Sequence, residues 1–308
     1  MFNKGEFTSA MRPRSYNVPI PKSGIPYDWT QLYRAGFEYE VGQQTHWQRL
    51  VVEYTRRQLT FQSNILPAIS ELADVMKHNT GWHYLAGLWR ECLTFDFCWF
   101  PDTDPKDPQK QRLRTSHAPS WSWASIQKGN ILWLGFDASW PNLGNESEYI
   151  KDPLKIHIRV FDAPCTLAGP SATGPVQTGF IDVEGFLAPI SRRDLELGED
   201  FSWELCTVRK FWDESNYETK LRRDQELYLL PVLTMTYLDY RDADDFLDSL
   251  AVEHTGLVLT NSAPGSKDMV RVGLLNVLEE YSRTCEDMGF SYCGSEQALK
   301  MKSIWDSI

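Results

Sequence analysis

One stretch constrains the fold of this chain more than any other: His117-Ala118-Pro119-Ser120-Trp121-Ser122-Trp123-Ala124-Ser125. Pro119 lacks a backbone N–H and disfavours helix in the residue before it. Large and small residues then alternate, which predicts a strand with Trp121 and Trp123 on one face. Two interpretations remain open. The indoles belong to a core strand whose small face lets another element approach, or they form an exposed platform for a sugar, base or peptide.

The composition is that of a globular protein with a substantial core. Of the 308 residues, 42% are hydrophobic and 24% are charged, and the net charge is −11. This charge repels phosphate backbones and anionic lipids, so nucleic acid and membrane surfaces are not expected partners. No apolar run approaches the ~18 residues of a membrane helix, and the N-terminus lacks a signal-peptide-like segment. We therefore expect a cytoplasmic protein whose six scattered cysteines form no disulfide framework.

The pattern along the chain predicts four regions. Prolines up to Pro26 argue against a long helix, so residues 1–43 are expected to form an extended arm held by the aromatic residues Tyr27, Trp29, Tyr33 and Phe37. A three-helix unit (44–98), an antiparallel β domain (115–283) and a tail with a short helix (284–308) follow. Residues 44–283 are expected to form one compact unit.

Helical periodicity supports the three-helix unit. A capping box at Thr45–Gln48 predicts the start of a helix whose buried face is Trp47, Leu50, Val51 and Tyr54. A second helix, capped by Ser63 or Asn64, should end at Gly81 and bury Ile65, Ile69, Leu72 and Met76. A third is expected from about Trp82 to Phe97, with Leu85, Leu88, Trp89 and Cys92 inward.

Beyond Thr115 the period becomes alternating, which predicts strands. Because the connections are not helical, the sheet should be largely antiparallel. The predicted fold class is α+β: an arm and a three-helix unit packed on an antiparallel sheet or sandwich of about seven strands. The strands are expected at 119–126, 130–136, 154–162, 178–187, 227–235, 255–261 and 269–275. The expected core is a junction of tryptophans: Trp82, Trp89, Trp99, Trp121, Trp123 and Trp133.

Three segments together resemble the C-terminal half of fungal heterokaryon incompatibility (HET) domain proteins. They are Trp47–Thr60 followed by Leu66-Pro67-Ala68-Ile69-Ser70, then Tyr84-Leu85-Ala86-Gly87-Leu88-Trp89-Arg90, then Ala118–Ser125. Their order and spacing match the family, and weaker similarity extends to 255–259 and 270–274. The resemblance implies a part in fungal non-self recognition, with a protein partner that is either the upstream domain or a related protein.

The chain departs from the family at its start. The signature segments of the N-terminal domain of the family, which resembles the TIR fold, are absent from this sequence. We therefore expect a truncated product or a short paralogue, and no activity of that upstream domain carries over to residues of this chain. The family-motif residues that remain are interpreted as structural: Tyr84, Leu85, Ala86, Gly87, Leu88, Trp89, Ala118, Pro119, Ser120, Trp121, Ser122, Trp123, Ala124 and Ser125.

No catalytic or cofactor motif is found in the sequence. His117 beside Ser116 and Ser120 is interpreted as structural, as are His78 and His83 near Glu91 and Cys92, whose spacing fits no metal-ligand pattern. The loop 101–108 lacks the glycine and terminal glutamate of a calcium loop. Arg90 and Glu91 are expected to make an ion pair at the sheet edge or in solvent. No cofactor or metal is expected.

A non-enzymatic recognition or regulatory module is therefore the leading functional hypothesis. Two alternatives stay open. One is a ligand-binding β-module with exposed aromatic residues. The other is a hydrolase with a non-standard site, which requires His117 or His254 to converge with carboxylates.

Overall fold

The computed structural model describes residues 38–57, 61–102, 113–114, 117–127, 129–134, 154–191, 195, 206–214, 225–239, 249–282 and 304. The predicted arm lies outside these residues except for 38–43, which are helical rather than extended. The predicted tail lies outside them except for Ile304, as does almost all of the loop 101–108. None of the helices in these ranges is both long enough and apolar enough to cross a membrane.

The first two predicted helices are present with altered starts. Helix α2 (Glu38–Thr55) begins before the predicted capping box, since nothing between Glu38 and Thr45 except Gly42 opposes helix. Its predicted face is confirmed: Trp47 and Val51 are fully buried and pack with the half-buried Leu50 and Tyr54. The next predicted helix is two 3₁₀ turns, Gln62–Asn64 and Pro67–Ile69, followed by α3 (Ser70–Thr80).

Helix α3 ends as the sequence predicts. Gly81 adopts φ +74°, and its N–H donates to the carbonyl of Lys77 at 2.8 Å, which is a left-handed C-cap. Ile65, Ile69 and Met76 are buried as predicted. The prediction for Leu72 is wrong, because this side chain is 49% exposed.

The third predicted helix is wrong. Residues 84–89 form a β-hairpin, in which β1 (Tyr84–Leu85) pairs antiparallel with β2 (Leu88–Trp89). The two turn residues, Ala86 and Gly87, have φ of +47° and +97°, the pattern of a type I′ turn, which suits the twist of a hairpin. Helix follows only briefly, as a 3₁₀ turn (Arg90–Cys92) and α4 (Leu93–Asp96).

The segment around Pro119 is not the predicted strand either. The N–H of Ser122 donates to the carbonyl of Pro119 at 3.0 Å, which closes a turn. The Ser122 hydroxyl then accepts from the N–H of Ala124 and caps a 3₁₀ helix at Trp123–Ser125. A serine that satisfies a nearby backbone N–H favours such a cap over an extended ladder. Extended structure begins only at β5 (Ile126–Gln127), which pairs with β4 (Leu113–Arg114).

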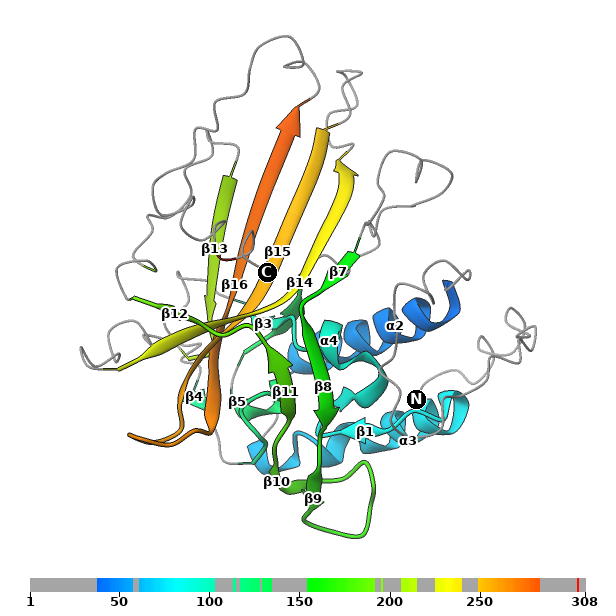
Figure 1. Cartoon of the computed structure of the whole chain (residues 1–308). Helices are drawn as coiled ribbons and strands as arrows, with labels where there is room; N and C mark the ends of the chain where they lie inside the picture. Colours follow the sequence, from blue (N-terminus) through cyan, green and yellow to red (C-terminus); the bar gives the residue numbers. More distant parts are fainter. Residues whose placement is uncertain are drawn as a thin grey trace.

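The described strands form one large antiparallel sheet and several small pairs. Strands β14 (Leu227–Asp239), β15 (Ser249–Asn261) and β16 (Met269–Ser282) make its long centre, with β13 (Cys206–Trp212) at one edge. The edge of β14 is paired by β7 (Leu154–Ile156) and by β12 (Ala188–Ile190). A further pair joins β3 (Trp99–Pro101) to β6 (Ile131–Trp133). The α+β class is confirmed, whereas a sandwich of about seven strands is not (Figure 1).

A long hairpin leaves the edge of β14 between β7 and β12. It runs through β8 (Ile158–Asp162) and β9 (Cys165–Leu167) and returns through β10 (Val176–Gly179) and β11 (Asp182–Gly185). β8 pairs with β11 and β9 with β10, and the N–H of Phe180 donates to the carbonyl of Pro164 between the two pairs. We call residues 158–185 the strap, because the hairpin packs against the helical part of the molecule (Figure 1).

One buried arginine joins the large sheet to the tryptophan-rich part of the chain. Arg271 of β16 is 2% exposed, and its guanidinium carbon lies 3.5 Å from the ring centre of Trp99. Its Nη1 donates to the carbonyl of Phe97 at 2.7 Å, and its Nη2 donates to the carbonyl of Trp99. Its Nε lies 3.2 Å from Oδ2 of Asp213, which compensates the buried positive charge.

Candidate functional site

Helix α2, the hairpin turn and the 3₁₀ helix at Trp123–Ser125 meet at one backbone carbonyl. The carbonyl oxygen of Gly87, in the hairpin turn, accepts from Nε1 of Trp47 at 2.9 Å and from Nε1 of Trp123 at 2.8 Å. The Ser122 hydroxyl donates to the neighbouring carbonyl of Ala86 at 2.5 Å. Because both carbonyls of the turn point into the interior, they serve as acceptors for the buried indole N–H groups and the serine hydroxyl. We call these contacts the motif junction.

Gly87 is required at this junction for two separate reasons. Its φ of +97° is a conformation that side chains with a Cβ rarely adopt. A Cβ at this position would also lie 2.7 Å from Nε1 of Trp123. The glycine therefore allows both the turn and the close approach of the indole.

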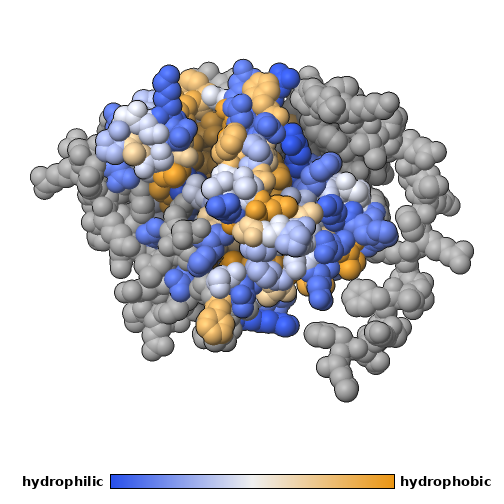
Figure 2. Space-filling view, turned by 90° about the horizontal axis from the view of Figure 1, so that it is seen from below, coloured by the Kyte–Doolittle hydropathy of each residue, from blue (hydrophilic) through white to orange (hydrophobic). Residues whose placement is uncertain are grey.

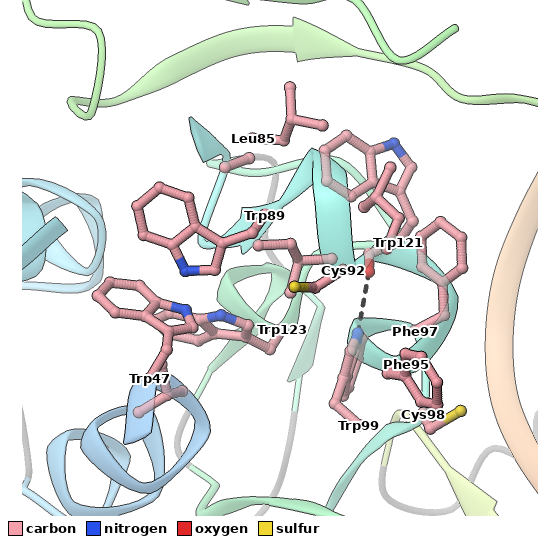
Figure 3. Close-up of a cluster of buried hydrophobic side chains, with 14 of the residues drawn as sticks. Trp47, Leu85, Trp89, Cys92, Phe95, Phe97, Cys98, Trp99, Trp121 and Trp123 are labelled. Atoms are coloured by element: carbon pink, nitrogen blue, oxygen red, sulfur yellow. Dashed lines mark hydrogen bonds between the residues drawn. The ribbon is translucent and has the colours of Figure 1, made fainter. Parts of the chain in front are cut away.

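Figure 3 shows the interior cluster to which the junction belongs. Trp47 packs edge-on against Trp89 with ring centres 5.3 Å apart, and Nε1 of Trp99 donates to the carbonyl of Trp121 at 2.9 Å. The predicted tryptophan junction is largely confirmed, with Trp133 half-buried and the other five buried. Trp121 is 9% exposed and Trp123 is fully buried, so the platform proposed for these two indoles is not formed.

The remaining motif residues connect the junction to its surroundings. Tyr84, Leu85, Leu88, Ala124 and Ser125 are buried, whereas Ala118 and Pro119 are half-buried. The Ser120 hydroxyl accepts from the backbone N–H of Arg271 at 3.4 Å. The strap covers the same segment, since a Cβ on Gly179 would lie 2.9 Å from Cγ of Pro119. The motif thus touches α2, the large sheet and the strap at once.

Asp96 has a role in this region that the sequence analysis missed. Its side chain is fully buried and accepts from the backbone N–H of Trp89 at 2.9 Å and from Nε2 of Gln48 at 3.3 Å. The backbone carbonyl of Asp96 accepts from Nε1 of Trp133 at 3.3 Å. The sequence did contain a signal for this role, because Asp96 lies between Phe95 and Phe97. A carboxylate in such an apolar segment requires buried hydrogen-bond donors.

His83 and Arg90, which flank the hairpin, each contact an acidic side chain. Nδ1 of His83 lies 2.7 Å from Oε1 of Glu91, and Nη1 of Arg90 lies 3.5 Å from Oδ1 of Asp162 in the strap. The ion pair expected there at the sheet edge or in solvent is thus formed by Arg90 with Asp162 of the strap. Within the described ranges, no group of three or more His, Cys, Asp or Glu side chains is arranged to hold a metal ion.

A second polar cluster lies within the large sheet. The Thr234 hydroxyl is 2.8 Å from Nε2 of His157 and 2.8 Å from Nδ1 of His254. Nε2 of His254 lies 3.4 Å from Oε1 of Glu279, and both of these side chains are more than nine-tenths buried. Since the hydroxyl has one proton, it donates to one imidazole and accepts from the other. His254 thus converges with a carboxylate, whereas His117 is exposed.

Burial and nearby charge lower the pKa of one member of this cluster, His157. The pKa of His157 is lowered to about 4, chiefly by burial and further by the charges of Lys155 and His254. Neutral His157 can accept the proton of the Thr234 hydroxyl, which in turn accepts from His254. This arrangement leaves Nε2 of His254 directed at Oε1 of Glu279.

Two of the cysteine thiols, Cys98 and Cys165, are poor nucleophiles. Cys92 and Cys98 are buried, and Cys165 is half-buried. Burial raises the pKa of Cys98 despite the nearby positive charge of Arg271, and it raises the pKa of Cys165 to about 11. Because the thiolate is the reactive form, these two residues do not provide an activated sulfur at neutral pH.

Comparisons with known proteins give no assignment. No family model matches the chain, and no curated protein or solved structure matches it. The motif junction is therefore interpreted from its own geometry.

The two reasons for glycine at position 87 can be separated by a matched pair of variants. Gly81→Ala has a similar positive φ but open space around the new Cβ, so it should cost about 1 kcal/mol of unfolding free energy. Gly87→Ala adds the collision with Trp123 and should cost about 3 kcal/mol or more. Chemical denaturation of both variants measures this difference. Equal losses would show that the indole is not held against the turn.

The lowered pKa of His157 predicts an acid-sensitive stability. Its pKa in the folded protein, about 4, lies below its value of about 6.5 in the unfolded chain. The neutral ring therefore contributes full stability above about pH 6.5, and this is lost as the pH falls through 4. Relative to His157→Gln, the wild-type protein should lose on the order of 1–2 kcal/mol over that range, allowing for solvent screening of a half-buried ring.

Denaturation midpoints at pH 7, 5.5 and 4 test this prediction. The matched control is His78→Gln on the exposed face of α3, which should keep the wild-type pH dependence. A His157→Gln profile parallel to wild type would contradict the assignment.

Proposed function

We propose that this chain is a non-enzymatic recognition or regulatory module of the HET type that acts in the cytoplasm through protein contacts. The proposal draws on the resemblance of the motif segments to the C-terminal half of that family. In this interpretation the motif residues are a scaffold, because their polar groups bind one another in the interior. The partner is a TIR-like HET domain, carried by the same polypeptide or by a related protein.

The observation that supports a binding role is the exposure of large apolar side chains along the strap and at its base. Phe161, Phe180 and Phe186 are 47%, 64% and 45% exposed, and Leu167 and Leu187 are each 38% exposed. A protein surface usually shows exposed apolar side chains singly, whereas here five large ones lie on one hairpin and its base. Figure 2 shows apolar groups emerging between hydrophilic ones on the lower side of the molecule. We call these five residues the strap patch.

The strap is held firmly enough to present this patch. The Thr173 hydroxyl at its tip donates to Oδ1 of Asp74 on α3 at 2.8 Å, and Arg90 pairs with Asp162 near its middle. Ile158, Ala163 and Val176 bury their side chains in the main core. A rigid scaffold that displays apolar groups binds a partner with little loss of conformational entropy.

Association with a HET-domain protein tests the proposal. The tagged chain should co-purify with a full-length HET-domain protein expressed in the same cells. The variant Phe180→Ser/Phe186→Ser should reduce recovery about tenfold, because it removes two anchors of the apolar surface. The control Phe61→Ser removes an equally exposed aromatic residue (66%) outside the strap and should bind like wild type. No association, or equal loss in both variants, would contradict the proposal.

A hydrolase remains the second candidate because His254 lies beside Glu279 and the Thr234 hydroxyl. A histidine oriented by a carboxylate is a common general base. Purified protein should then cleave chromogenic esters or peptides, and His254→Gln should abolish the cleavage. Equal background rates for wild type and variant would remove this candidate.

A further inference from the structure

The strap patch is apolar, and the charged side chains beside it restrict which occupant it can bind. Asp162 and Asp182 face each other in register, and Glu184 stands opposite Arg159. All four side chains are exposed, and Arg159 stacks on Phe161 with its guanidinium carbon 4.7 Å from the ring centre. Like charges opposite each other on neighbouring strands repel, and within the described ranges the cation that offsets this is Arg90, whose Nη1 lies 3.5 Å from Oδ1 of Asp162. The patch therefore favours an occupant with both aromatic and basic side chains.

One segment of this chain has that composition. Residues 1–37 contain five Lys and Arg (Lys4, Arg12, Arg14, Lys22, Arg34) and two acidic residues (Glu6, Asp28). Their net charge is +3, whereas the whole chain carries −11, so the remaining residues carry −14. The same segment contains seven aromatic residues: Phe2, Phe7, Tyr16, Tyr27, Trp29, Tyr33 and Phe37. It is thus opposite in charge to the rest of the protein and rich in aromatic groups.

The length of this segment allows it to reach the strap. It ends where α2 begins, at Glu38, and its 37 residues could span roughly 100 Å when extended. A folded body of this size has a radius of gyration of roughly 18 Å. The conformational entropy lost on closing the intervening loop grows only slowly with loop length. Because the segment is tethered to the same molecule, its effective concentration at the strap is high.

We propose that residues 1–37 bind the strap patch of the same molecule and cover the surface that the partner would use. A basic side chain of the segment pairs with Asp182, which faces the like charge of Asp162, and its aromatic side chains pack against Phe161, Phe180 and Phe186. The segment is then an internal competitor of the partner. This regulation rests on the proposed function, since the competition concerns the same surface, although the contact itself needs no partner.

Photo-crosslinking in the purified full-length chain tests the contact. A variant with p-benzoylphenylalanine in place of Phe180 is irradiated, and the crosslinked peptides are identified by mass spectrometry. We expect the crosslinks to fall within residues 1–37 of the same molecule, in the monomeric fraction. The matched control places the same group at Phe61, which is 66% exposed against 64% for Phe180, and should give several-fold fewer crosslinks to that segment.

Charge variants test the electrostatic part. Arg12→Glu/Arg14→Glu should reduce the crosslink yield from position 180 several-fold, and Arg12→Lys/Arg14→Lys should preserve it. Crosslinks to a second copy, no crosslinks to residues 1–37, or a yield indifferent to charge reversal would each overturn the proposal. The crosslinking assay contains no partner, so a negative result overturns the internal contact and does not bear on the recognition role. A failure to co-purify with a HET-domain protein overturns the recognition role and does not bear on the internal contact.

Discussion

The fold depends on the burial of one charged side chain, Arg271. A guanidinium this deep in the interior is costly unless its charge is paired and its donors are used. Here Asp213 supplies the charge, and the carbonyls of Phe97 and Trp99 accept from the remaining donors. Arg271 lies in β16 and Asp213 directly follows β13, so both belong to the large-sheet side, whereas the two carbonyls belong to the β3 region. Separating the large sheet from the tryptophan-rich part would therefore remove two acceptors from the guanidinium.

In the motif junction the buried donors are neutral, and they also need acceptors. Two indole N–H groups from α2 and from the 3₁₀ helix at Trp123 share the carbonyl of Gly87. Removing the acceptor would leave buried donors unpaired, which costs more than the hydrogen bonds contribute. Ser120, next to this 3₁₀ turn, also accepts from the backbone of Arg271, so the junction and the arginine belong to one continuous interior.

Prediction from the sequence succeeds where local periodicity and burial agree. The inward face of α2 and the left-handed cap at Gly81 follow from residues close together in the chain. The long strands β14 to β16 were predicted in place but too short. In β15 and β16 the missed parts contain buried polar side chains, such as Glu253, His254 and Asn276, which interrupt the apolar alternation.

Prediction fails where tertiary contacts override local preference. Residues 84–89 have apolar spacing compatible with helix, but the carbonyls of Ala86 and Gly87 are needed as acceptors, and only a tight turn presents them to Ser122 and Trp123. The alternation at Pro119–Ser125 suggested a strand, although the serine caps a turn. Arg271 and Asp213 are 58 positions apart, so no spacing rule could pair them. Likewise, the strap patch becomes visible only when the hairpin shows which phenylalanines face outward.

The most direct test of this account is whether the two halves of the described structure unfold together. Guanidinium chloride unfolding can be followed by far-UV circular dichroism, which reports the strands, and by tryptophan fluorescence, which is dominated by the buried cluster. We predict coincident transitions in the wild-type protein and two separated transitions in Arg271→Met, because the variant removes the guanidinium that binds Asp213 and the carbonyls of Phe97 and Trp99. Coincident transitions in the variant, at an unchanged midpoint, would contradict the central role of Arg271.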